Sequence, residues 1–156
     1  MKYLAFIWHE RGALTRYLGR GSDRLSIVRV SDNLPPSAVI LWRGDGDGLR
    51  IRSQMFDIRP RFEIGVLTFD VVRPGPIEFS LDVAVTLGPP RKIEKLVIAE
   101  DGVTAESGLI LEDARGEHIL VLAGASPYFL AIRAPGYSGE FQPEYPLDRY
   151  QRVPTV

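Results

Sequence analysis

The sequence has no cysteine, and it has no long apolar run. The absence of cysteine from all 156 residues excludes disulfide frameworks, zinc-thiolate sites, iron–sulfur clusters and cysteine nucleophiles. The first apolar segment, from Tyr3 to Trp8, stops after six residues. A signal peptide needs about 7–15 apolar residues and a membrane helix needs about 20. We therefore expect a soluble protein of the bacterial cytoplasm that has no membrane partner.

Recognised catalytic and cofactor motifs are also missing. The sequence holds no P-loop, no Gly-x-Gly-x-x-Gly after a strand, and no Gly-x-Ser-x-Gly nucleophile signature. Acid–base catalysis needs a histidine or carboxylate with a positioned partner, and neither His9 nor His118 has one at a recognised spacing. We therefore assign no catalytic residue, no metal ligand and no cofactor.

The composition is that of a globular domain. Hydrophobic residues make up 45% of the chain and charged residues 25%, and a chain of this length can bury about 68–70% of its unfolded surface. The length predicts one domain, residues 1–156, because single domains commonly span about 100–200 residues. Residues 135–156 are rich in Pro, Tyr and Phe without a helix or strand period, so we expect an irregular tail packed on the rest.

The strictest pattern is the alternation of apolar and polar residues from Ile77 to Val85. Side chains on a strand point alternately to opposite faces, so this segment has one buried and one solvated face. Similar short runs between Gly, Pro and Asp recur at about 8–12-residue spacing, which is typical of a sandwich or barrel. We predict an all-β, antiparallel sandwich or barrel of about 9–11 short strands. The expected strands are Lys2–Trp8, Ala13–Leu18, Leu25–Val30, Ala38–Trp42, Leu49–Ile58, Arg61–Val72, Ile77–Val85, Ile93–Ala99, Gly108–Glu112, His118–Ala123 and Tyr128–Ala134.

Three segments carry more detailed expectations. Residues 2–18 form either a hairpin around Gly12 or a helix, because their apolar residues also fit a 3.6-residue period. In residues 49–58 and 61–72 the apolar parity changes partway, so we expect β-bulges near Ser53–Gln54 and near Gly65. Residues 108–123 form the clearest hairpin, with Asp113 to Gly116 as a turn in which the glycine has positive φ.

The loop from Arg43 to Gly48 contains two aspartates among three glycines. Oxygen ligands in a tight turn suit Ca²⁺, but the bidentate glutamate that would complete a twelve-residue calcium loop is replaced by Phe56. We interpret the segment as a hairpin loop between two strands.

Arginines cluster in the first half of the chain. Residues 1–61 hold 11 Lys and Arg against 6 Asp and Glu, whereas the remainder holds 8 against 14. Arg50 and Arg52 share a strand face, and Arg59 and Arg61 flank the next turn. Such a group could bind phosphate, an acidic partner or RNA, but no aromatic platform for bases is interleaved. We select Arg50, Arg52, Arg59, Arg61 and His118 as candidate ligand-binding residues.

We therefore expect a non-enzymatic binding or interaction module that self-associates or binds a protein partner, because exposed strand edges invite pairing. One alternative is a barrel that holds a small ligand, with weak acid–base chemistry at His118 or His9. The other is an anion or nucleic-acid binder that uses the arginine group, with nucleic acid the less expected partner.

Overall fold

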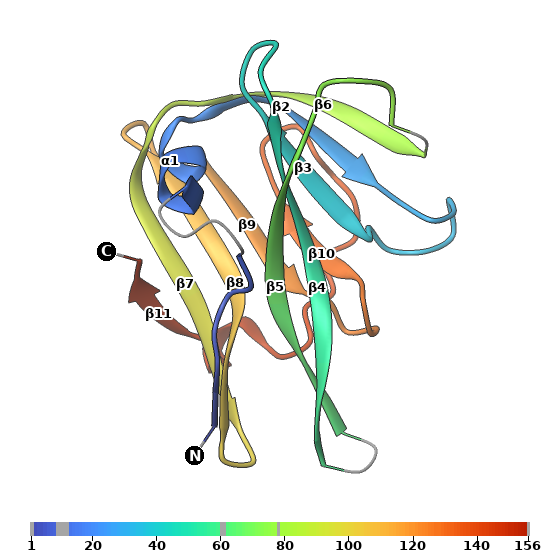
Figure 1. The fold of residues 1–156 in the computed structure, drawn as a ribbon, viewed down its shortest axis with the longest axis vertical. Coiled ribbons are helices and arrows are strands. Elements are labelled where there is room, and N and C mark those ends of the chain that lie inside the picture. Colours follow the sequence, from blue (N-terminus) through green and yellow to red (C-terminus); the bar gives the residue numbers. More distant parts are fainter. Residues whose placement is uncertain (1, 9–12, 60–61, 78, 156) are drawn as a thin grey trace.

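The chain folds into a β-sandwich (Figure 1), and its described part contains one short α-helix. The computed structural model describes residues 2–8, 13–59, 62–77 and 79–155. Two sheets, antiparallel apart from one short parallel strand, pack together without closing into a barrel. The predicted all-β fold is therefore confirmed in its sandwich form. No helix in this described part is long and apolar enough to cross a membrane.

The first sheet, sheet A, has the strand order β10-β9-β8-β7-β11, and β1 pairs with β8 in parallel. The second, sheet B, has the order β5-β4-β3-β2-β6. The strands of sheet A are β1 (Lys2–Leu4), β7 (Pro90–Glu100), β8 (Val103–Asp113), β9 (His118–Ala123), β10 (Leu130–Arg133) and β11 (Gln151–Pro154). Those of sheet B are β2 (Ser22–Val28), β3 (Ala38–Trp42), β4 (Gly48–Arg59), β5 (Phe62–Val72) and β6 (Ser80–Leu87).

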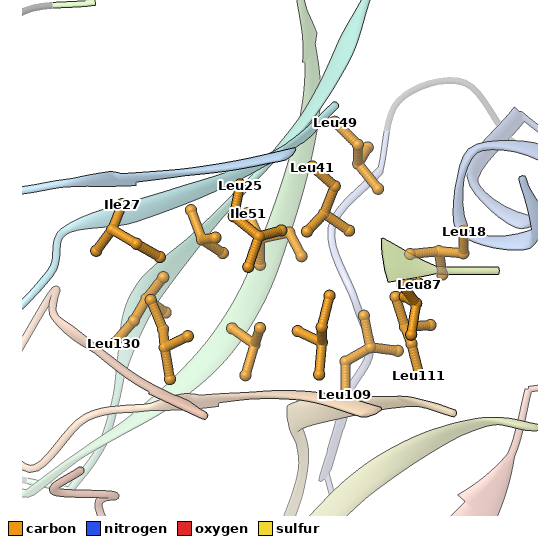
Figure 2. Packing of buried hydrophobic residues seen from close by; sticks show 14 of the residues in the cluster. Leu18, Leu25, Ile27, Leu41, Leu49, Ile51, Leu87, Leu109, Leu111 and Leu130 are labelled. Carbon is orange, nitrogen blue, oxygen red and sulfur yellow. The ribbon is translucent and has the colours of Figure 1, made fainter. Parts of the chain in front are cut away.

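The main core lies between the two sheets. In Figure 2, Ile27, Leu25 and Leu41 of sheet B face Leu130 and Leu109 of sheet A. These five side chains are all 2% exposed or less, and burying a leucine or isoleucine stabilises the fold by about 1.5–3 kcal/mol. The core is therefore the principal contact between the layers.

A second apolar cluster covers the other face of sheet A. Residues of β9 alternate between the two, with Val121 in the main core and Leu120 and Leu122 in the second cluster. Tyr150 belongs to the second cluster, and Phe141 packs against it. The hairpin from residue 108 to 123 is thus apolar on both faces because the C-terminal segment covers its outer side.

The long hairpin of β4 and β5 passes from the first cluster to the second. Phe69 lies in the main core, whereas Ile64 and Val66 lie in the second cluster. Pairing runs without a shift from Gly48 opposite Val72 as far as Asp57 opposite Glu63, and the register shifts only between Asp57 and Arg59.

The bulges expected near Ser53–Gln54 and near Gly65 are therefore wrong. The parity of apolar residues changes because a different layer covers each part of the hairpin. Gly65 marks the crossing, since a Cβ there would stand 2.5 Å from Cβ of Ala123.

A bulge does occur in β8. Leu96 pairs with Gly108 and Val97 pairs with Glu106, so Ser107 is an extra residue in this strand. Without a bulge, residues 105 and 109 would lie on the same face of the strand. The bulge places them on opposite faces, because Leu109 lies in the main core and Ala105 in the second cluster. Glu106 consequently points into the sandwich.

The turn predicted between β8 and β9 is confirmed. Gly116 has a φ of 85° and donates its N–H to the carbonyl of Asp113. The Asp113 carboxylate accepts N–H groups of Gly88, Arg115 and Glu117. Burial opposes ionisation of this carboxyl, but these donors hold the pKa of Asp113 below its usual range.

The N-terminal segment joins the two sheets along one side. After β1 pairs with β8, Ile7 exchanges backbone hydrogen bonds with residues 67 and 69 of β5. The predicted strand Ala13–Leu18 is instead helix α1 (Ala13–Gly19). The strand expectation is wrong because Leu14 and Leu18, four residues apart, contact the main core from one helix face.

The start of β6 and the C-terminal segment also differ from expectation. The strand predicted from Ile77 begins only at Ser80, because Phe79 has a φ of 56° and cannot continue an extended chain. The C-terminal segment is irregular around a single 3₁₀ turn (Leu147–Arg149), but it ends in β11, which pairs with residues 94–97 of β7.

Candidate functional site

Arg50 and Arg52 lie on the outer face of sheet B, as their spacing predicts. Strand pairing places Asp70 directly opposite Arg50, and the Arg50 guanidinium donates two hydrogen bonds to that carboxylate. This bonding raises the pKa of Arg50 although burial lowers it. Arg52 stands 3.8 Å from the same carboxylate and is 48% exposed. Two guanidinium groups thus share one carboxylate. Because Arg52 is half-exposed and has the longer contact with Asp70, its positive charge is only partly compensated.

Of the other three candidates, His118 is the one whose side chain the structure describes. Arg61 and the side chain of Arg59 lie outside the described part of the chain, as does His9. His118 is exposed at the start of β9 in sheet A, opposite Glu112. It lines a surface depression of about 590 Å³ together with Arg133 and Phe141. The structure therefore separates His118 from Arg50 and Arg52.

A groove of about 870 Å³ runs across the outer face of sheet B. Its floor is apolar and includes Val28, Ala38 and Ile40, and its charged groups among the described lining residues are Arg50 and Arg52. The remaining described lining residues are Ile7, Ser37, Ser53, Gln54, Thr68, Ile77 and Tyr128. The surface thus combines apolar area with a net positive charge and many hydrogen-bonding groups, a combination typical of a binding site.

Tyr128 stands at the rim of this groove in an unusual backbone conformation. Phe129 N–H donates to the carbonyl of Ser126 at 3.3 Å, so Pro127 and Tyr128 occupy the two central positions of a turn. Tyr128 has a φ of 68° and is 60% exposed. A left-handed conformation costs a non-glycine residue about 1–2 kcal/mol. The turn therefore presents an aromatic ring where a glycine would be less strained.

The glycine-rich loop is a hairpin turn, as interpreted from the sequence. It joins β3 to β4, and Gly44 with a φ of 59° donates its N–H to the Asp23 carboxylate at 2.7 Å. Arg20 donates to the backbone carbonyl of Asp47 at 2.8 Å. Within the described ranges, no group of three or more His, Asp or Glu side chains is placed to hold a metal ion.

An acid–base cluster around the buried Glu106 has no counterpart in the sequence predictions. Glu106 is 2% exposed, and its Oε1 accepts the N–H of Phe6 at 2.7 Å. Its Oε2 accepts the hydroxyl of Tyr3 at 2.6 Å and the ammonium of Lys95 at 2.7 Å. The hydrogen bond to Glu106, together with burial and the nearby charge, raises the pKa of Tyr3 to about 12. The interruption of the apolar run of β8 by Glu106-Ser107-Gly108 is the sequence signal for this cluster.

A partly buried carboxyl, Glu144, lies in the C-terminal segment. Burial raises its pKa to about 7, although the N–H of Gly65 donates to its Oε1 at 3.3 Å and partly opposes the shift. Glu63 raises the pKa further by repulsion. This group fastens the C-terminal segment to the long hairpin and makes that contact sensitive to pH.

Comparisons with protein-family models, with curated proteins and with solved structures find no match to this chain. The function must therefore be argued from the surfaces described above.

Proposed function

We propose that this protein is a non-catalytic binding module that holds an acidic, extended segment of a protein partner in the groove on sheet B. The observation that carries the proposal is a groove whose described charged side chains are both arginines, above an apolar floor and beside the exposed Tyr128. Charge complementarity of this kind steers a partner and rejects segments of the same sign. An aromatic ring at the rim is a common anchor in binding surfaces.

The test begins without assuming a partner sequence. A random peptide library is displayed and selected on the wild-type protein, and Asp and Glu should be enriched in the selected peptides. The same peptides should bind the Arg52→Glu variant at least about ten-fold more weakly, because a half-exposed cation becomes an anion. Arg91→Glu is the matched control, since Arg91 is exposed on β7 of sheet A. Selected peptides without acidic enrichment, or equal losses in both variants, would contradict the proposal.

A second role, self-association, is supported by strand β6. This strand pairs with β2 on one side and closes one edge of sheet B. It contains eight residues with one charged side chain and no proline, and Leu81 is 55% exposed. Natural edge strands are usually protected by lysine, proline or a bulge. Strand β6 has neither lysine nor proline, and its register shift against β2 lies beyond Ala84, so residues 80–84 pair regularly. The edge is therefore suited to antiparallel pairing with β6 of a second copy.

This pairing is tested by sedimentation equilibrium at micromolar concentration. We expect a dimer for the wild type and a monomer for Leu81→Lys, because a lysine on the edge interferes with pairing. Leu147→Lys serves as the control, since Leu147 is 40% exposed in the 3₁₀ turn of the C-terminal segment. A monomeric wild type would refute self-association and leave the groove proposal untouched.

A further inference from the structure

A separate cavity of about 350 Å³ lies at the edge of the main core, beside helix α1. The cavity and the groove share no described lining residue, because the extended N-terminal segment sends Phe6 and Trp8 to one side and Ile7 to the other. The size falls within the range of small-molecule sites, about 300–1,000 Å³. The cavity is therefore a second, independent candidate site.

Six of its ten described lining residues are apolar, although about half of the wall surface is polar. Phe6 and Trp8 both contact the ring of the buried Phe69, with ring centroids 4.9 Å and 6.4 Å away. Leu14 and Leu18 of α1 and Ile93 of β7 complete the apolar surface. Thr15 and Thr155 supply hydroxyl groups at its edge. An alkyl or aromatic body would be shielded from water by these side chains.

One wall is polar, and its two charged groups differ in their exposure. The Glu106 side chain is 3% exposed and that of Lys95 is 27% exposed. Glu106 already accepts hydrogen bonds from Phe6, Tyr3 and Lys95. An ammonium has three donors, and Lys95 uses one of them in a hydrogen bond within the described structure. The cavity therefore offers a cationic donor, whereas the carboxylate behind it is occupied.

The bulge at Ser107 explains how this arrangement forms. Without the extra residue, Glu106 would face the second cluster, as Ile110 does on the same strand. With it, Glu106 turns inward beside Lys95 and holds the ammonium at the cavity wall. Bulges often redirect a side chain in this way next to a functional site.

We propose that this cavity binds a small amphipathic carboxylate, whose head group accepts a hydrogen bond from Lys95 while its alkyl or aromatic body lies among the apolar side chains. A single lysine with apolar walls suits one monovalent head group. A ligand amine is disfavoured because it would meet the Lys95 ammonium. The Glu106–Lys95 pair stays intact, since the ligand uses a different donor of the same ammonium.

The test is calorimetric titration with four probes that share an alkyl body: octanoate, octanamide, 1-octanol and octylamine. We expect octanoate to bind in a 1:1 ratio, at least about ten-fold more tightly than each of the other three. Lys95→Met should reduce octanoate binding to the level of 1-octanol. Because that variant leaves Glu106 buried without its cation, its fold is checked by circular dichroism before titration.

A second variant keeps the charged pair and fills the space. Leu14→Trp adds a ring from α1 into the cavity, and octanoate binding should be abolished while the circular dichroism spectrum is retained. The proposal is overturned if octanoate does not bind the wild type, if the four probes bind equally, or if octanoate still binds the filled variant. None of these results bears on the groove of sheet B, whose variants carry changes elsewhere.

Discussion

Replacement of Glu106 by glutamine gives the sharpest test of the packing inside the sandwich. The amide can still accept the N–H of Phe6, but its NH₂ cannot accept from Tyr3 and turns a donor toward the Lys95 ammonium. Removing one partner of a buried ion pair costs about 3–5 kcal/mol. Because Lys95 retains some exposure and can turn toward water, we expect a loss of about 2–3 kcal/mol in the free energy of unfolding.

Urea unfolding followed by tryptophan fluorescence measures this loss. Glu112→Gln is the control, because the Glu112–Lys92 pair joins the same two strands at 3.8 Å with both side chains at least 38% exposed. Exposed pairs contribute about 0–1 kcal/mol. In the double variant Glu106→Gln/Lys95→Met, part of the stability should return, since no buried charge is left alone. The reasoning is refuted if Glu106→Gln costs no more than Glu112→Gln.

The same substitution has a signature at alkaline pH. The pKa of Tyr3 is raised from 10.0 to about 12 by its hydrogen bond to Glu106. A raised pKa contributes stability that is fully present below pH 10.0 and is lost as the pH rises through about 12. Absorbance titration should detect a tyrosine with a pKa near 12 that moves toward 10.0 in Glu106→Gln. An unchanged titration curve would show that this hydrogen bond is absent in solution.

Three further predictions concern other parts of the molecule. The pKa of Glu144 is raised from 4.5 to about 7, so the contribution of this group to stability is present below pH 4.5 and is lost as the pH rises through about 7. Glu144→Gln should therefore stabilise the protein by about 2 kcal/mol at pH 8 but not at pH 4, as measured by urea unfolding. Gly65→Ala should cost about 1–3 kcal/mol, since its Cβ would collide with Ala123, whereas Gly75→Ala, which meets nothing within 4 Å, should cost almost nothing in thermal unfolding. Asp70→Asn should tighten the binding of selected acidic peptides by about two- to five-fold in fluorescence anisotropy, because it frees both groove arginines of their shared carboxylate.

Alternation and turn chemistry predicted much of the fold. The strands Ala38–Trp42 and His118–Ala123 have the predicted boundaries, and Gly116 has the expected positive φ. These features depend on local sequence, because the polar and apolar residues alternate within one strand and the turn residues are adjacent in the chain.

Features that depend on tertiary contacts were not predictable in the same way. The parity change around Gly65 indicated a bulge, but two separate apolar clusters explain it. Helix α1 is only seven residues long, too short to form without packing against the core. Strand β11 contains a proline and has four residues, too few for an alternating pattern to be recognised, and it forms because β7 offers an edge.

The candidate sites likewise combine features that local sequence predicts with features that tertiary contacts determine. The spacing of Arg50 and Arg52 predicted a shared face, but their partner Asp70 is supplied by strand register. Lys95 and Glu106 meet through the bulge at Ser107, which local alternation does not reveal. Sequence patterns therefore located the charged face of sheet B and missed the polar wall inside the sandwich.

The most direct test of the proposed binding function is nuclear magnetic resonance of the ¹⁵N-labelled protein during titration with a selected acidic peptide. Binding in the groove predicts that the largest amide shifts fall on residues lining it, including Ala38, Ile40, Arg52, Thr68 and Tyr128, and that they disappear in Arg52→Glu. Shifts concentrated on sheet A, or unchanged by that substitution, would contradict the proposal that this face of sheet B holds the partner.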